Sequence, residues 1–221
     1  MDNKISFKSK IQFVDYSKFR RIIKDGCAFI EYKTNTCDIL SCSDFYTENI
    51  RTCSAGGFVK PIRRLFSPFK KALGFHFLNN KKNLEHTIPR LQSALNFTPS
   101  GGLLIGGKKL YEKNGKYSLL NFEKIKTFMG SVLPDFSFFQ QQRYLYGQTH
   151  IHYSLSKDTW TICSEINGEN NLKGLPNKCV STVEDLSKHF KKIHIAKQDS
   201  LFIGDKEITK SEAPYFFTGS R

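Results

Sequence analysis

The sequence lacks any apolar run of the roughly 18 residues that a membrane-spanning helix needs. Its opening residues, MDNKISFKSKIQF, contain no continuous apolar stretch, which argues against a secretory signal peptide. We therefore expect no transmembrane segment. We expect the protein to be cytoplasmic, or to enter a host cell as an effector without a cleaved signal peptide.

Paired metal-binding motifs are also missing, although the chain has six cysteines. No two of them have C-x-x-C spacing, and Cys37 and Cys42, which have four residues between them, have no matching Cys or His pair nearby. A structural zinc site normally uses two such pairs. A chain of 221 residues also needs no disulfides to hold its core. We therefore expect reduced thiols, no metal and no cofactor.

Acidic residues are scarce relative to basic ones, with 20 Asp and Glu against 34 Lys and Arg, for a net charge of +14. Such a charge favours an anionic partner, although a Lys-rich solubilising surface explains it equally well. Lys outnumbers Arg, whereas proteins that read base sequence depend on Arg. No nucleic-acid-binding signature occurs. The balance favours an acidic protein partner over nucleic acid.

The chain does contain enough apolar material for a packed core, with 39% hydrophobic and 14% aromatic residues. Alternation of apolar and polar residues over 149–165 predicts a hairpin that turns at Ser-Lys-Asp. Helical spacing predicts helices over 85–97 and 118–133, the second with Ser118 as N-cap. Further elements are expected as strands at 27–34, 50–59, 74–80 and 101–113 and as a basic helix at 183–193. Because strands outnumber helices, the fold class is a mixed α/β (α+β) sandwich.

The stretch YTENIRTCSAGGFV, residues 46–59, surrounds one thiol with unusually small side chains. Cys53 is followed by Ser54, Ala55, Gly56 and another glycine. Small side chains give a substrate carbonyl room to approach the sulfur, and they would leave backbone N–H groups uncovered to hold an oxyanion. A buried core thiol beside a tight turn or bulge is the simpler interpretation of the same residues.

A thiol becomes an effective nucleophile when a base takes its proton. His76, in the apolar stretch GFHFLNN, is the candidate base, and Thr47, six residues before Cys53, is a candidate to orient it. A core histidine packed between Phe75 and Phe77 would look the same in the sequence.

The order of these features over about residues 45–165 resembles the CheD family, the chemoreceptor glutamine deamidases of bacterial chemotaxis. In that family a Thr stands six residues before the catalytic Cys, as Thr47 does before Cys53. The catalytic His follows on the next strand, as His76 does in ALGFHFLNN. A strand ending in Gly-Gly and an Asn at a helix start come next, and LLIGGKKLYE and Asn121 in SLLNFEKIKTFM are similar.

The resemblance implies a CheD-like core over 41–166 with extensions at 1–40 and 167–221. It also implies deamidation of glutamine in a protein substrate through a thioester, in chemotaxis or as an effector. Two departures lie beside the motif: Arg51-Thr52 replaces Gly-Ser before the Cys, and Gly147-Gln148 replaces a second Gly-Gly. The loop between Cys and His is longer and basic. We expect substrate contacts there and near the helix, from Lys60, Arg63, Arg64 and Asn121.

Two other functions are compatible with the sequence. A papain-like protease or deamidase would combine Cys53 with His150 and Asp158, which follow it in the right order. His150 and His152 are two residues apart, so they should share one face of a strand. A catalytically dead module that binds acidic partners would use the basic surface and would not need Cys53.

Overall fold

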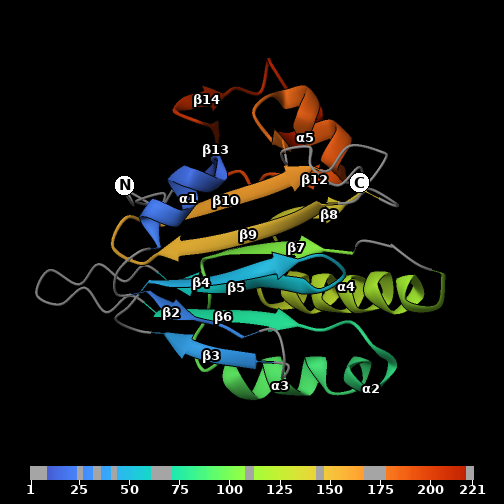
Figure 1. Ribbon diagram of the computed structural model, residues 1–221. Helices are drawn as coiled ribbons and strands as arrows, with labels where there is room; N and C mark the ends of the chain where they lie inside the picture. Colours follow the sequence, from blue (N-terminus) through green and yellow to red (C-terminus); the bar gives the residue numbers. More distant parts are fainter. Residues whose placement is uncertain are drawn as a thin grey trace, which may run out of the picture.

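The computed structural model describes residues 9–23, 27–31, 36–40, 44–60, 71–107, 112–142, 147–166 and 178–217. Over these ranges the chain is a mixed α/β protein built on two mixed β-sheets, which confirms the expected fold class (Figure 1). No helix in the described ranges combines the length and the hydropathy that a bilayer span requires.

Sheet A has eight described strands in the order β14-β13-β1-β10-β9-β4-β2, with β11 paired to one end of β10. Its centre is the predicted hairpin, in which Trp160 lies opposite Tyr153. Strand β1 pairs in parallel with both β10 and β13. The strands are β1 Lys10–Phe13, β2 Ala28–Phe29, β4 Phe45–Ile50, β9 Gly147–Ser154, β10 Thr159–Ile166, β11 Lys178–Cys179, β13 Ser200–Ile203 and β14 Lys206–Ile208.

Sheet B has six described strands in the order β12-β8-β7-β5-β6-β3. Its central strand β5 is antiparallel to both neighbours, whereas β7 and β8 run parallel. The strands are β3 Thr36–Leu40, β5 Ser54–Lys60, β6 Lys71–Phe77, β7 Gly101–Gly106, β8 Ser137–Gln141 and β12 Phe190–His194.

The described helices are α1 Tyr16–Ile22, α2 Lys81–Leu84, α3 Thr87–Ala94, α4 Glu112–Val132, α5 Val183–His189 and α6 Pro214–Phe217. Helix α4 begins six residues before Ser118, so the prediction of Ser118 as its N-cap is wrong. The helix expected over 183–193 ends at His189, and the chain continues as strand β12. A capping box between Thr182 and Asp185 fixes the start of α5.

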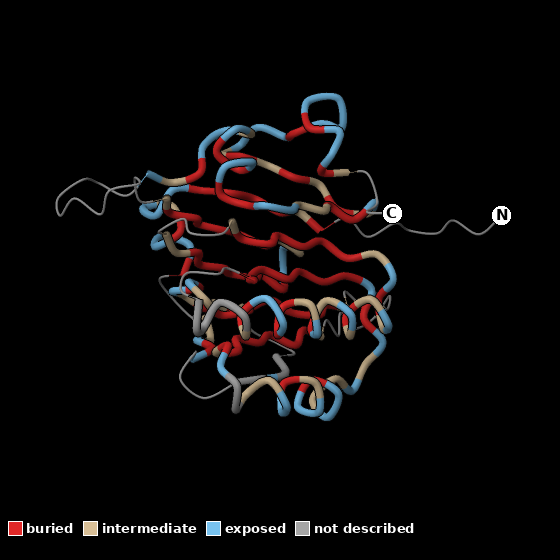
Figure 2. Tube along the Cα trace, turned by 90° about the vertical axis from the view of Figure 1, so that its right-hand side faces the viewer, coloured by how far each residue is buried: buried red, intermediate tan, exposed pale blue. Residues whose placement is uncertain are grey.

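The alternation of side chains along β5 and β6 divides the core into two layers. Ala55 and Val59 face sheet A, whereas Phe58 and Phe75 face the helices. The layer between the sheets includes Phe45 and the central hairpin, and the second layer lies against α3 and α4. Figure 2 shows the buried strand interior and the exposed outer sides of the helices. Burial of each such aromatic side chain contributes roughly 1.5–3 kcal/mol.

The glycines after Cys53 serve strand packing. A Cβ at Gly56 would lie 1.9 Å from the carbonyl oxygen of Leu103, and one at Gly57 would lie 2.6 Å from that of Leu73. Side chains at these positions would therefore push apart the neighbours of the central strand. The small residues of this motif are explained by the sheet alone, without an attack platform for a substrate.

The terminal segments contribute to both sheets. Strand β1 lies inside sheet A between β10 and β13, and β12 extends sheet B beside β8. Ser9 donates a hydrogen bond to Asp158, which ties the start of β1 to the turn of the central hairpin. The segments at 1–40 and 167–221 thus supply strands to the sandwich itself, in addition to helices α1 and α5 on its outside (Figure 1) and the short helix α6, whose Phe216 packs into the layer between the sheets.

Candidate functional site

Cys53 lies where the chain crosses from one sheet to the other. Strand β4 of sheet A ends at Ile50, and strand β5 of sheet B begins at Ser54. The pairing of β4 with β9 shifts register between Thr47 and Ile50, and Asn49 has a left-handed φ of 60°. This irregularity turns the chain out of sheet A and sets Cys53 at the edge of the layer between the sheets.

His76 lies on the same face of sheet B as the thiol. It pairs with Ala55 across β5 and β6, and Cys53 is two residues before Ala55. Diagonal neighbours of this kind are about 7–8 Å apart at the backbone, within reach of an imidazole. The backbone of Asn79, which is three residues beyond His76, lies close enough to the sulfur of Cys53 to lower the pKa of the thiol. The thiol therefore lies at the end of β6 that carries the imidazole.

Thr47 holds the imidazole in one tautomer. Its hydroxyl donates to the carbonyl oxygen of Ile30 at 2.8 Å, and the same oxygen lies 2.5 Å from Nδ1 of His76. Because the hydroxyl proton is used on Ile30, the oxygen must accept from His76, so Nδ1 carries the proton. In a neutral ring Nε2 is then the basic nitrogen. All three side chains are buried, and Thr47 and His76 are fully inaccessible to solvent.

Burial keeps both partners uncharged at neutral pH. Burial lowers the pKa of His76 to about 3 and raises the pKa of Cys53 to about 11. The backbones of Thr52 and Asn79 lower the pKa of Cys53, but less than burial raises it. The resting state is therefore a thiol beside a neutral imidazole rather than a thiolate–imidazolium pair. Cys53 is 4% exposed, and it follows directly on half-buried Thr52 and exposed Arg51.

A polar network supports the backbone beside the thiol. Asn121 donates to Oδ1 of Asn79 at 2.5 Å, and Asn79 in turn donates to the carbonyl oxygen of Thr52. Ser118 donates to the same carbonyl at 2.9 Å, and Ser54 lies 3.3 Å from the Asn79 amide. Asn121 was expected to contact substrate, but it is 1% exposed and positions Asn79 instead. Asn79 and Ser118 carry no sequence signal that marks them.

The expected oxyanion donors are not available. Ala55 and Gly56 pair with β6 on one side and β7 on the other, so the sheet uses their backbone N–H groups. The expectation that these groups are uncovered is therefore wrong, and Ser54 faces Asn79 on the opposite side of the strand from the thiol.

The expected basic substrate contacts are only partly described. Lys60 ends β5, is half-buried and pairs with Lys71. Arg63 and Arg64 lie outside the described residues.

The papain-like arrangement is contradicted by the placement of its histidine. His150 lies on the outer face of sheet A, where its ring contacts Phe19 of α1, whereas Cys53 lies between the sheets. His150 and His152 do share one strand face, as predicted, because both alternate with the inward-facing Ile151. Asp158 occupies the hairpin turn with a φ of 50° and accepts hydrogen bonds from Ser9 and Tyr153 rather than from His150.

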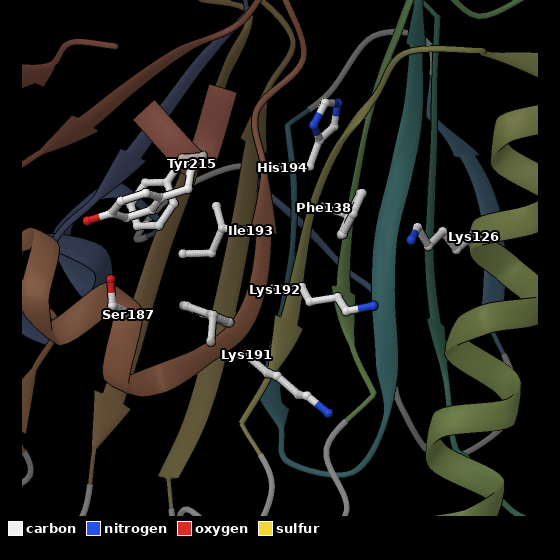
Figure 3. A pocket seen from close by; sticks show the side chains of 10 residues that line it. Lys126, Phe138, Ser187, Lys191, Lys192, Ile193, His194 and Tyr215 are labelled. Carbon is white, nitrogen blue, oxygen red and sulfur yellow. The ribbon is translucent and has the colours of Figure 1, made fainter. Parts of the chain in front are cut away.

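A basic groove lies at the β12 edge of sheet B, lined by residues from both faces of the sheet. It has a volume of about 480 Å³ and lies between α4 and β12. Figure 3 shows Lys126 on the helix and Lys191 and Lys192 on the strand around Phe138. None of the described residues that line this groove is acidic.

Neither a protein-family model nor a curated protein matches this chain.

Proposed function

We propose that the protein is a cysteine-dependent hydrolase of protein glutamine side chains, which converts Gln to Glu and releases ammonia. The observation that carries this proposal is the contact between Thr47 and Nδ1 of His76. It leaves Nε2 as the basic nitrogen on the face of sheet B that also holds Cys53. The similarity of the motif to the CheD family supports the choice of a carboxamide as substrate.

The reaction follows from the neutral resting pair. As the sulfur of Cys53 attacks the carboxamide carbon, its proton moves to Nε2 of His76 and a carbon–sulfur bond forms. The carbon–nitrogen bond then breaks, and ammonia leaves with the proton from His76. Water attacks the resulting thioester while His76 takes one of its protons. The carbon–sulfur bond breaks, the thiol regains a proton, and glutamate leaves.

Cys53 and His76 are the catalytic residues in this scheme, and Thr47 is a positioning residue. A buried imidazole with a low pKa is a weak base, so its orientation and tautomer determine how well it assists the thiol. Thr47 controls both through one contact. Asn79 and Asn121 hold the backbone on which the thiol sits.

The test uses intact proteins as glutamine donors. The protein is incubated with a mixture of acidic proteins. A coupled assay measures ammonia release, and mass spectrometry measures the conversion of Gln to Glu. Added hydroxylamine should divert the thioester to a γ-glutamyl hydroxamate. Wild type should give both products, and Cys53→Ala and His76→Asn should give neither. Equal conversion by wild type and Cys53→Ala would refute the proposal.

The basic groove favours a second role, the binding of an acidic partner. Lys126, Lys191 and Lys192 meet there without a neutralising carboxylate among the described lining residues. Such a role requires no thiol, so Cys53→Ala should bind as wild type does. Lys126→Glu combined with Lys192→Glu should slow association with an acidic protein and weaken its salt dependence. Unchanged association in that variant would remove this second function.

A further inference from the structure

Three side chains that can bind metal meet on the outer face of sheet A, away from Cys53. They are Cys27 just before β2, Asp44 just before β4, and His152 in the middle of β9. Their donor atoms all lie within 4.8 Å of one another. The three strands are neighbours in the sheet, since β2 pairs with β4 and β4 pairs with β9.

His152 is the most informative member of this cluster. It is 2% exposed, and neither ring nitrogen has a hydrogen-bond partner among the described residues. Nε2 lies 3.6 Å from Oδ2 of Asp44, which is beyond hydrogen-bond reach. A buried imidazole whose nitrogens make no hydrogen bond has lost its hydration without compensation, so its lone pair is available to a ligand.

The other two donors are held in place by the backbone. Oδ1 of Asp44 accepts from the N–H of Leu155 at 2.9 Å, which leaves Oδ2 directed toward His152. The N–H of Ala28, next to Cys27, donates to the carbonyl oxygen of Asp44 at 2.8 Å. Carboxylates that bind metals are usually fixed by a hydrogen bond to the other oxygen, as Leu155 fixes Asp44 here.

From this geometry we propose that Cys27, Asp44 and His152 form a mononuclear Zn²⁺ site. A thiolate, an imidazole and a carboxylate are the ligands that suit this borderline-soft ion. Tetrahedral zinc with bonds of about 2.0–2.3 Å sets its ligand atoms about 3.3–3.7 Å apart. The separation of Asp44 and His152 already falls in that range, and a closure of about 1 Å completes the set.

The fourth coordination position faces a cavity of about 530 Å³ that Asp44 and His152 help to line. Lys10, Arg21 and Lys157 line the same cavity. One thiolate and one carboxylate together neutralise the charge of Zn²⁺. The loaded site is therefore uncharged, and the three cations repel it less than they would repel Zn²⁺ held by neutral ligands. The open position is available to water, as in zinc sites with three protein ligands.

The test uses the full-length protein with Co²⁺ as a spectroscopic probe and Zn²⁺ as the competitor. One Co²⁺ per chain should bind and give thiolate-to-cobalt charge-transfer absorption, which an equivalent of Zn²⁺ removes. Cys27→Ser should abolish the absorption, and Asp44→Asn, which can still accept from Leu155, should weaken Co²⁺ binding at least tenfold.

Two matched variants separate this site from the other thiols. Cys53→Ser and Cys179→Ser should bind Co²⁺ with unchanged absorption and affinity. Both substituted ligands, Cys27 and Asp44, are partly exposed, so their variants are expected to fold; circular dichroism checks this. Absence of charge-transfer absorption in wild type would overturn the proposal, as would absorption that survives Cys27→Ser.

Discussion

Thr47 and His76 come from different sheets, yet Oγ1 of one lies 2.5 Å from Nδ1 of the other. The contact crosses the buried layer between β4 and β6, where neither side chain reaches solvent. It sets the tautomer of the ring because the hydroxyl proton of Thr47 is already used on Ile30. The contact leaves Nε2 of His76 as the proton acceptor, on the face of sheet B that also holds Cys53.

Replacing Thr47 should separate its chemical role from its packing role. Thr47→Val keeps the shape but removes the acceptor for Nδ1, so the ring loses its fixed tautomer. Thr47→Ser keeps the acceptor. We expect Thr47→Val to lower the deamidation rate about 10²-fold and Thr47→Ser less than tenfold. Initial rates at several pH values measure this; equal rates for the two variants would contradict the assigned role.

The low pKa of His76 predicts loss of stability in acid. Its folded pKa of about 3 lies below the usual value of 6.5, so its contribution to stability is present above pH 6.5 and is lost as pH falls toward 3. In His76→Asn the fall in unfolding free energy between pH 6.5 and 4.5 should be smaller by about 2 kcal/mol. Urea unfolding at the two pH values measures it. The exposed His86→Asn is the control and should match wild type.

Asn121 should stabilise the backbone at Thr52 and Cys53 through its hydrogen bond to Asn79. Asn121→Ala leaves Oδ1 of Asn79 buried without its donor, at a cost of about 1–3 kcal/mol. It also loosens the support of the Thr52 carbonyl, so the deamidation rate should fall while Cys53 and His76 remain present. Thermal unfolding and initial rates measure both effects. Asn96→Ala, at an exposed position, should change neither.

Arg51 and Gln148 stand at the two positions where the motif departs from the family pattern, and they contact each other at 3.1 Å. Arg51 is exposed two residues before Cys53, so it should favour an acidic residue beside the substrate glutamine. Arg51→Ala should lower kcat/KM about tenfold for peptides with Glu next to Gln, and less for peptides with Ser there. The exposed Arg90→Ala is the control. An equal decrease for both peptides would disprove this preference.

The local elements of the fold could be predicted, and their pairing could not. Alternation predicted the hairpin of β9 and β10, and helical spacing predicted α3 and most of α4, because both patterns arise from neighbouring residues. The position of β1 between β10 and β13 depends on contacts across about 150 residues or more of chain, which no local pattern encodes.

The site shows the same division. Thr47, Cys53 and His76 were predicted from the small residues after Cys53 and from the resemblance to the CheD family, and the structure brings Thr47 and His76 into contact. Asn79 was missed and Asn121 was given the wrong role, because the sequence gives no sign of an amide's hydrogen-bond partner. Cys27, Asp44 and His152 were missed because they come from three strands that only the sheet brings together.

The reactivity of the cysteines toward iodoacetamide tests whether His76 activates Cys53. It is mapped by mass spectrometry at pH 7.5 and 9.5. Iodoacetamide is small and carries a primary carboxamide. Cys163, which is fully buried with a raised pKa, is the internal reference. We expect Cys53 to react at least tenfold faster than Cys163, and we expect His76→Asn and Thr47→Val to remove this advantage. Reaction of Cys53 no faster than Cys163, or at an unchanged rate in His76→Asn, would show that Cys53 is a structural thiol.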